Sequence, residues 1–217
     1  MSQVLGIPKG QAVSYGKRKL EVLRSAATLF NERGFHNTTM DDIAAILNVT
    51  KPALYYYAKS KDELLYEIGS IALDNAKTLL DRIESTDDTG LEKLQQFFSG
   101  WTQAICGDFG RCLVLTKPES LEANSRKKSK LNRRQIQTRV ETIFRSGLKD
   151  HSINIATGKI DARMVTMALF DLHNGVAYWF ESGSEKAAKL PAAEIAEHYW
   201  NLFAAGLSSD TDQCQGE

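Results

Sequence analysis

The chain has 217 residues, of which 42% are hydrophobic and 25% are charged, as is typical of a globular protein. It contains no run of 18 apolar residues and no signal-peptide pattern, so we expect no membrane span, no secretion and a cytoplasmic location. Its 27 basic and 27 acidic residues cancel, yet the first 61 residues hold nine basic and only four acidic side chains. This imbalance favours a polyanionic partner for the N-terminal part.

Apolar residues recur at helical spacing along nearly the whole chain, which predicts an all-α fold of about nine helices. Residues 1–16 are expected to form a flexible arm. The first helix carries apolar residues from Leu20 to Phe30 on one face. It ends before Gly34, because glycine readily adopts the left-handed conformation of a helix C-cap.

A second and a third helix of about seven residues each follow, joined by a turn of three or four residues. Thr39 and Asp42 have the spacing of a capping box at the start of the second helix. Asn48 tolerates a tight turn, and Thr50 can cap the third helix. Two short helices at this spacing are typical of a helix-turn-helix motif over residues 39–58, whose second helix can enter a DNA major groove about 12 Å wide.

The third helix begins with side chains that can approach base edges: Lys51, Pro52 and Ala53. Leu54 should point inward, with Tyr57 partly on the same side. Tyr55 and Tyr56 should therefore be exposed, where a hydroxyl can bond to phosphate and a ring can lie against a sugar or a thymine methyl. Lys61 can hold phosphate beside the next helix N-terminus. The alternative is that these tyrosines simply begin a buried helix.

The stretch "RGFHNTTMDDIAAILNVTKPALYYYAKSKDELL" resembles the DNA-binding domain of TetR-family transcriptional regulators. The resemblance covers about residues 17–74 and implies a DNA-binding domain over residues 17–77. It implies a phosphate contact by Thr39 at the start of the second helix. It further implies contacts to bases and neighbouring backbone by Lys51, Pro52, Ala53 and Tyr56, and to phosphates by Tyr55, Tyr57 and Lys61.

Further helices fill the rest of the chain. The box of Ser60 and Glu63 opens a long fourth helix, and Thr89 opens a fifth. "CGDFGRC" is predicted to be a break. A long helix is expected from Pro118 towards Leu148, followed by two more over residues 161–181 and 191–207, and by a disordered tail over residues 209–217.

The TetR resemblance implies that residues 78–208 form a helical domain that dimerises and binds a small-molecule effector. The last two helices carry apolar residues suited to a dimer seam: Met164, Met167, Ala168, Leu172, Tyr199 and Phe203. Two such helices from each subunit would form a four-helix bundle with a two-fold axis, matched to an inverted-repeat operator in double-stranded DNA. The alternative is that these faces complete the core of a monomer.

An effector pocket is expected where large apolar side chains face a few polar groups between helices. The candidates are Phe97, Trp101, Ile105, Phe109, Asp171, His173, Asn174 and Tyr178. Mid-helix polar groups that face inward need partners, which is why the three from the "DLHN" segment are included. A plain core would show the same apolar pattern, and His173 could equally be a solvated surface residue.

The segment "RCLVLTKPESLEANSRKKSKLNRR", together with "NGVAYW", is similar to TetR regulators of fatty-acid and steroid breakdown that sense acyl-CoA thioesters. The likeness implies that a basic run could receive CoA phosphates: Arg126, Lys127, Lys128, Lys130, Arg133 and Arg134. Tyr178 stands where that subgroup often has a cation. The alternatives are a solvated helix face and a sensor of drugs or aromatic compounds.

No motif of a common enzyme class occurs, so we predict no catalytic residue, and a helical enzyme is the remote alternative. The three cysteines and four histidines lack ligand spacing, so no metal site and no cofactor are expected. The predicted function is that of a repressor. An effector bound in the C-terminal domain would shift the fourth helix and thereby move the DNA-binding domains of the dimer out of register with the operator.

Overall fold

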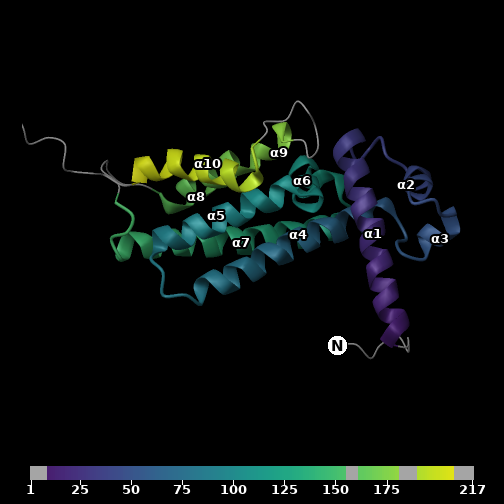
Figure 1. Cartoon of the computed structure of the whole chain (residues 1–217), viewed down its shortest axis with the longest axis horizontal. Helices are drawn as coiled ribbons and strands as arrows, with labels where there is room; N and C mark the ends of the chain where they lie inside the picture. The colour runs from purple at the N-terminus through teal and green to yellow at the C-terminus, as the bar shows by residue number, and fades with distance from the viewer. Residues whose placement is uncertain (1–8, 155–160, 181–189, 208–217) are drawn as a thin grey trace, which may run out of the picture.

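The computed structural model describes residues 9–154, 161–180 and 190–207. Within these residues the chain forms ten α-helices and one short 3₁₀ helix, and no strand (Figure 1). The helices are α1 (Lys9–Arg33), α2 (Met40–Ile46), α3 (Lys51–Tyr55), α4 (Lys61–Glu84), α5 (Gly90–Cys106), α6 (Asp108–Leu115), η1 (Pro118–Ser120), α7 (Ala123–Lys149), α8 (Ala162–Asn174), α9 (Val176–Trp179) and α10 (Ala192–Leu207). The all-α prediction is therefore confirmed.

The first three helices and the start of α4 enclose a small core, which we call the head. Its centre is made by side chains with no solvent exposure: Leu29, Ile43, Leu54, Leu64 and Ile68. The helices begin where the sequence indicates, because Thr39, Thr50 and Ser60 each accept a hydrogen bond from a backbone N–H of the first turn. Between α2 and α3, Asn48 adopts a left-handed conformation with φ 52°.

Two boundaries in the head differ from the sequence prediction. Helix α1 begins at Lys9, so residues 9–16 are helical and do not belong to an arm. Helix α3 has five residues where about seven were expected. The Tyr56 N–H donates to the Pro52 carbonyl at 3.2 Å, and the Tyr57 N–H donates to the Leu54 carbonyl, only three residues back, at 2.9 Å, so the helix closes there.

The remaining helices and the second half of α4 enclose a larger core, which we call the body. Phe97, Phe98 and Phe144 are fully buried there. The predicted break at "CGDFGRC" is confined to Gly107, and Asp108 opens α6, a helix that the sequence did not predict. The predicted helix over residues 161–181 is interrupted at Gly175, a residue that weakens helices, and α9 follows.

Helix α4 joins the two parts. Its first half, with Leu64, Leu65 and Ile68, belongs to the core of the head, and its second half, with Leu73 and Leu80, belongs to that of the body. Figure 1 shows it running out of the head alongside α5 and α7. Helix α4 is therefore shared by the two cores.

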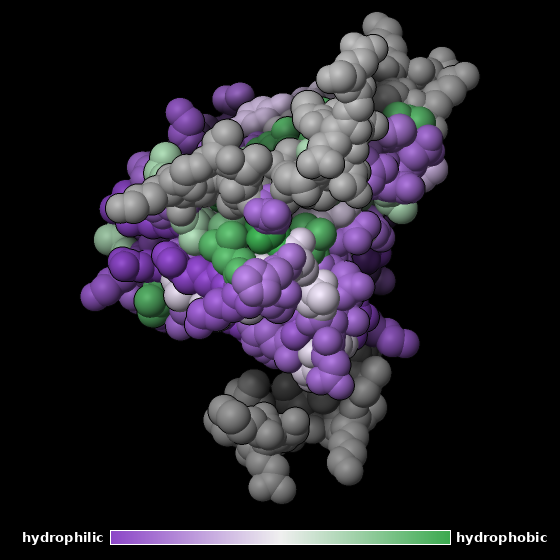
Figure 2. Space-filling model, turned by 90° about the vertical axis from the view of Figure 1, so that its left-hand side faces the viewer, coloured by the Kyte–Doolittle hydropathy of each residue, from purple (hydrophilic) through white to green (hydrophobic). Residues whose placement is uncertain are grey.

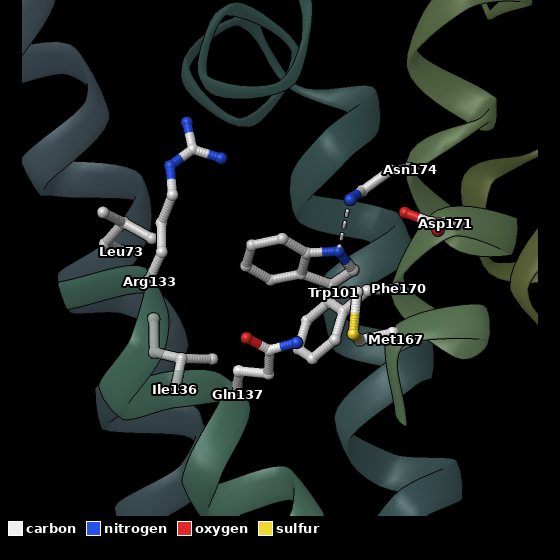
Figure 3. Close-up of a pocket in the computed structure, with 9 residues that line it drawn as sticks. All are labelled: Leu73, Trp101, Arg133, Ile136, Gln137, Met167, Phe170, Asp171 and Asn174. Atoms are coloured by element: carbon white, nitrogen blue, oxygen red, sulfur yellow. Dashed lines mark hydrogen bonds between the residues drawn. The ribbon is translucent and has the colours of Figure 1, made fainter. Parts of the chain in front are cut away.

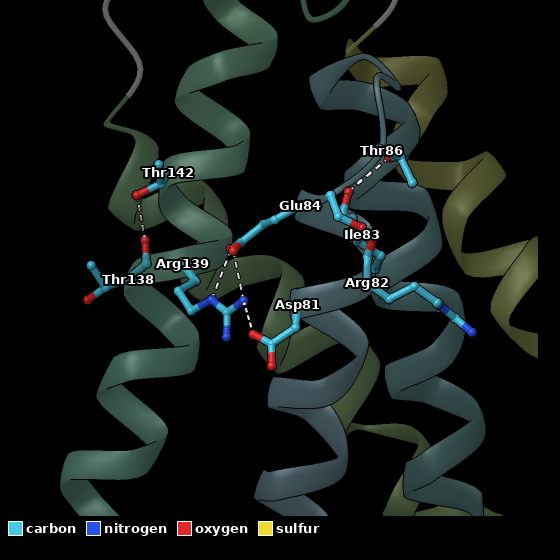
Figure 4. Close-up of polar contacts among 9 residues, drawn as sticks. Asp81, Arg82, Ile83, Glu84, Thr86, Thr138, Arg139 and Thr142 are labelled. Carbon is cyan, nitrogen blue, oxygen red and sulfur yellow. Dashed lines mark hydrogen bonds and ion pairs between the residues drawn. The ribbon is translucent and has the colours of Figure 1, made fainter.

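Polar contacts fasten α4 to α7 near both ends. At the head end, Asp62 accepts hydrogen bonds from the Glu122 backbone N–H (2.7 Å) and the Ser125 hydroxyl (3.0 Å). These contacts cap α7, whose own N-cap side chain makes no capping bond. At the far end, Arg139 binds Glu84 through two N–H groups and Asp81 through a third contact of 2.7 Å (Figure 4).

No helix within the described part of the chain is long and apolar enough to cross a membrane.

Candidate DNA-binding surface and effector pocket

The outer face of α3 is exposed. Tyr55 and Tyr56 have 43% and 66% of their surface accessible, while Leu54, which directly precedes them, is fully buried. The residues at the start of the helix are exposed as well: Lys51, Pro52 and Ala53. The possibility that the tyrosines begin a buried helix is thereby excluded, and α3 presents a short convex surface of aromatic and basic groups.

Charged side chains beside α3 are held in defined positions. Lys51 donates to the Asp41 carboxylate at 2.9 Å, and this hydrogen bond and the carboxylate charge raise the pKa of Lys51. At the start of α2, the Thr39 hydroxyl and backbone N–H both bond to Asp42, which lowers the pKa of that carboxyl. Lys51 therefore stays positively charged at neutral pH, and Thr39 is exposed but bound in its capping box.

Lys61 points back into the head. Its ammonium donates to the backbone carbonyls of Phe35 (2.6 Å) and Thr38 (2.7 Å) and lies 4.4 Å from the centre of the Phe35 ring. Partial burial lowers its pKa. Two of its three N–H groups are used in these bonds, so only the third could donate to a phosphate. The phosphate contact of Lys61 stays a prediction.

Tyr57 is half-buried and packs on α1. Its ring stacks on Tyr15 at 5.3 Å, and Tyr56 meets Tyr15 edge-on at 5.5 Å. Lys19 completes this contact, because its ammonium donates to the Tyr57 carbonyl and to Glu67 of α4. The predicted phosphate contact of Tyr57 is untested. The contacts of Tyr15 were not predicted from the sequence, because Tyr15 lies in the segment that was expected to be a flexible arm.

A cavity of about 170 Å³ lies in the body between α4, α5, α7 and α8 (Figure 3). It is lined by Leu73, Trp101, Arg133, Ile136, Gln137, Met167, Phe170, Asp171 and Asn174. Three of the predicted pocket residues lie in this lining, and the Trp101 indole N–H donates to the Asn174 carbonyl oxygen at 3.0 Å. Met167, predicted for the dimer seam, also faces the cavity.

The other predicted pocket residues do not line this cavity. Phe97 and Ile105 are buried in the core of the body, and Phe109 packs between the two cores. Tyr178 is exposed, with 69% of its surface accessible. The pocket was expected to face the long helix α7, and Arg133 was expected as a contact for CoA phosphates. Ile136 and Gln137 of the lining were not predicted, because the side chains of α7 could not be matched to α8 from the sequence alone.

His173 is a core residue. It is fully buried and stacked on Phe98 at 4.7 Å, and its Nδ1 lies 2.6 Å from the Thr102 hydroxyl. That hydroxyl already donates to the Phe98 carbonyl, so Nδ1 carries the proton of the neutral ring. Nε2 has no partner, and burial lowers the pKa of His173 to about 4.

Two family models match the chain. The model of the bacterial regulatory proteins of the tetR family matches residues 22–68, which span the helix-turn-helix motif. The model of the tetracyclin repressor-like C-terminal domain matches residues 87–207, more than half of the chain. The chain belongs to the TetR family.

Curated relatives of this TetR-family protein match over less than half of the chain. A negative transcriptional regulator of the biofilm operon icaADBC from Staphylococcus aureus is 30% identical over 79 residues, which are 36% of this chain and 42% of the relative. The transcriptional repressor KstR2 of Mycolicibacterium smegmatis is 35% identical over 88 residues, 41% of this chain and 43% of the relative. The chain thus spans less than half the length of these relatives.

Solved structures of TetR regulators match along most of the chain. PfmR from Thermus thermophilus has a TM-score of 0.74 and 26% identity, covering 86% of this chain and 98% of its own. The ketosteroid regulator KstR2 of Mycobacterium tuberculosis has a TM-score of 0.78 at 22% identity, and the match covers 89% of this chain and 96% of the KstR2 chain. The structure of AibR in complex with isovaleryl coenzyme A and operator DNA has a TM-score of 0.71 and 19% identity. The match covers 85% of this chain and 97% of the AibR chain. The last two likenesses show the fold alone.

The basic run of this TetR protein is divided between two environments. Lys127, Lys128 and Arg134 are exposed, and Lys130 forms an exposed ion pair with Glu119. Arg133 instead turns inward, where its Nη2 donates a hydrogen bond to the Leu113 carbonyl at 2.7 Å. Most of the run is therefore a solvated helix face.

The helices predicted to form the dimer seam carry exposed apolar side chains. Met164 of α8 is 63% exposed and Leu202 of α10 is 73% exposed, while Leu172, Tyr199 and Phe203 are half-buried and Ala168 is exposed. The end of the body opposite the head shows an apolar area within a mostly hydrophilic surface (Figure 2). The seam itself stays a prediction.

The described cysteines are not reactive groups, because burial raises the pKa of Cys106 to about 11 and that of Cys112 to about 12. Among the described residues, no three His, Cys, Asp or Glu side chains lie together in a way that could hold a metal ion. The predicted disordered tail, with Cys214, lies outside the described residues.

Proposed function

We propose that this TetR-family protein is a DNA-binding transcriptional repressor of the cytoplasm, without catalytic activity, that a small-molecule effector releases from its operator. One observation carries the proposal: a single helix, α4, is part of the core beneath the exposed α3 and also lines the cavity of the body through Leu73. The match of the tetR-family model to residues 22–68, and the names of the S. aureus and M. smegmatis relatives as a negative regulator and a repressor, support the DNA-binding part.

The head contacts DNA through α3. Lys51, Pro52, Ala53 and Tyr56 meet bases and nearby backbone, while Thr39, Tyr55, Tyr57 and Lys61 meet phosphates. The exposure of Tyr55 and Tyr56 and the charge of Lys51 support this map. Phosphate contacts position a protein on DNA, whereas base contacts select the sequence.

Two subunits pair through α8 and α10. The exposed Met164 and Leu202 support this arrangement, because large apolar side chains that are exposed on adjacent helices favour association. A two-fold dimer reads an inverted repeat whose half-sites lie one helical turn, about 34–36 Å, apart.

The effector binds in the cavity between α4, α5, α7 and α8. Its class is that of acyl-CoA or fatty-acid-like compounds, as in the AibR complex with isovaleryl coenzyme A. A drug or aromatic compound is the second candidate, which the lining rings of Trp101 and Phe170 favour. A ligand here separates α4 from α7 between their contacts at Asp62 and at Arg139, where Lys77 of α4 also donates to Asn132 of α7. The heads then move apart and lose simultaneous contact with the two half-sites.

The test begins with selection of a binding sequence from a random DNA duplex library, using the full chain. We expect an inverted repeat, and an affinity whose logarithm falls linearly with the logarithm of salt concentration, by about 0.9 per phosphate contacted. Acyl-CoAs, fatty acids and aromatic compounds are then titrated into the complex, and one class should lower the affinity. No enriched sequence, or an affinity that does not depend on salt, would contradict the proposal.

A further inference from the structure

Arg133 is a half-buried cation of the body that has no counter-ion among the described residues. Its guanidinium donates once, to the Leu113 carbonyl, and its Nε is inaccessible to solvent and has no hydrogen-bond partner. Among the described residues no carboxylate lies within ion-pair distance of it, although Lys130, one turn earlier on α7, pairs with Glu119, and Arg139, further along α7, pairs with Asp81 of α4. Arg133 lines the cavity together with apolar side chains.

Such a group is unfavourable in the empty protein. Arginine does not lose its proton at physiological pH, so burial cannot be relieved by neutralisation as it can for lysine. An unpaired buried charge with an unsatisfied N–H is costly, and the cost disappears only when an anion supplies both charge and acceptor atoms. The burial that leaves Arg133 unpaired also lowers its pKa.

The remainder of the lining determines which anion fits. Leu73, Ile136 and Phe170 offer apolar surface, and Gln137 and Asn174 are neutral. Asp171 is the one acidic residue of the lining, and no second basic residue lies there, so a group with two or more negative charges would be repelled. A cavity of about 170 Å³ holds on the order of ten non-hydrogen atoms, if each takes the space of one water molecule.

We propose that the effector of this cavity is a free carboxylic acid with an apolar body of about ten non-hydrogen atoms, bound through its carboxylate to Arg133. This inference rests on the proposed function, because it names the effector class of the same regulator. The apolar body lies against Trp101, Phe170 and Ile136. Of the two classes named under the proposed function, the free acid is thus the expected ligand and the CoA thioester is not, because the acyl group of a thioester carries no charge that could pair with Arg133.

The same arginine links the cavity to the head. Leu113, whose carbonyl accepts from Arg133, lies on α6 next to Cys112, and Cys112 is part of the core of the head. A carboxylate competes with the Leu113 carbonyl for the guanidinium. Occupation of the cavity therefore loosens a contact between α7 and α6 beside the head.

The experiment measures binding by tryptophan fluorescence and by thermal unfolding of the full chain, with four probes that share one chain: octanoate, octanamide, octyl phosphate and octanoyl-CoA. We expect octanoate to bind about 10- to 100-fold more tightly than octanamide, because a charge-assisted hydrogen bond replaces a neutral one. Octyl phosphate and octanoyl-CoA should bind more weakly than octanoate.

Three variants sharpen this result. Arg133→Met should remove the preference for the acid over the amide and should raise the unfolding temperature of the ligand-free protein, since an uncompensated charge is gone. Arg133→Lys should retain part of the preference. Lys130→Met removes an exposed cation one turn earlier on α7 and should leave the preference unchanged.

An equal affinity for octanoate and octanamide, or an acid preference that survives in Arg133→Met, would overturn the proposal. So would Arg133-dependent binding of octanoyl-CoA or octyl phosphate that exceeds binding of the acid. These readouts need no DNA. If the protein selects an operator but does not prefer the acid, this inference alone fails; if it prefers the acid but selects no operator, the proposed function fails.

Discussion

The head and the body of this TetR protein position their functional residues in different ways. In the head, α3 is set by neighbours in the sequence: Thr50 caps it, Asn48 makes the turn before it, and Leu54 anchors it. In the body, the cavity forms where four helices meet, and the Trp101–Asn174 contact joins residues 73 positions apart. Local chemistry thus defines the DNA-binding surface, whereas only tertiary packing defines the pocket.

The two parts also differ in how they carry charge. Lys51 of the head is exposed and paired with Asp41, so its charge is available to DNA without a large cost to folding. Arg133 of the body is half-buried and has no ion-pair partner among the described residues, so its charge destabilises the ligand-free protein. A surface that binds a polyanion can keep its charges exposed to solvent whether or not DNA is bound. A pocket that responds to a ligand binds that ligand more tightly when its empty state is unfavourable.

The largest expected effect tests how tightly the body is packed. A Cβ on Gly90 would lie 2.2 Å from the Gly147 backbone nitrogen, and backbone cannot move aside cheaply. Gly90→Ala should therefore lower the free energy of unfolding by about 4 kcal/mol or more, measured by urea denaturation. Gly16→Ala in the head is the matched control, because a Cβ there meets nothing within 4 Å. It should stabilise α1 by up to about 1 kcal/mol.

If Gly90→Ala unfolds at the urea concentration of the wild type, the close contact between α5 and α7 is not present in solution. If Gly16→Ala has no effect on stability, α1 does not extend to residue 16.

The next effect concerns pH and is confined to the body. The pKa of His173 is about 4 in the folded chain and about 6.5 when unfolded, so folding favours the neutral ring. Its contribution to stability is complete above pH 6.5 and is lost as the pH falls towards 4. The loss should be about 3 kcal/mol in urea unfolding curves measured across this range.

His173→Gln should remove this pH-dependent loss, while His198→Gln, at an exposed position of α10, controls for the removal of a histidine as such. A stability that falls equally steeply in His173→Gln and in the wild type would show that other groups are responsible.

A smaller effect tests the connection between the two parts. Asp62 of α4 caps α7 through Glu122 and Ser125, so Asp62→Asn should weaken transmission without changing the cavity. We expect the effector to bind as before but to weaken operator binding about 5-fold less, a coupling loss of about 1 kcal/mol, measured by fluorescence anisotropy of labelled operator.

Arg82→Gln is the control on the same helix, because Arg82 is exposed and its side chain forms no hydrogen bond or ion pair within the described part of the chain. A response of Asp62→Asn equal to that of the control would mean that the signal does not pass through this cap.

The contrast between head and body also explains what the sequence could predict. Capping boxes and turn residues act over three or four positions, so the starts of α2, α3 and α4 were predicted correctly. Asp171 and Asn174 were assigned to the pocket because inward-facing polar groups need partners, and Trp101 because large apolar side chains between helices are typical of a small-molecule site. Phe97 and Ile105 have the same periodicity but face the core, and periodicity cannot distinguish the two. The inward direction of Arg133 depends on the packing of α7 against α4 and on the position of the Leu113 carbonyl of α6.

The central claim is that α3 of the head, and not the aromatic surface of the body, meets the DNA. Tyr56 and Tyr178 are equally exposed, at 66% and 69%, and lie in different parts of the molecule. Tyr56→Ala should lower operator affinity about 100-fold, since a dimer loses two contacts of about 1–3 kcal/mol each, while Tyr178→Ala should change it less than about 2-fold. Equal operator affinities for the two variants, measured by fluorescence anisotropy at one salt concentration, would contradict the account.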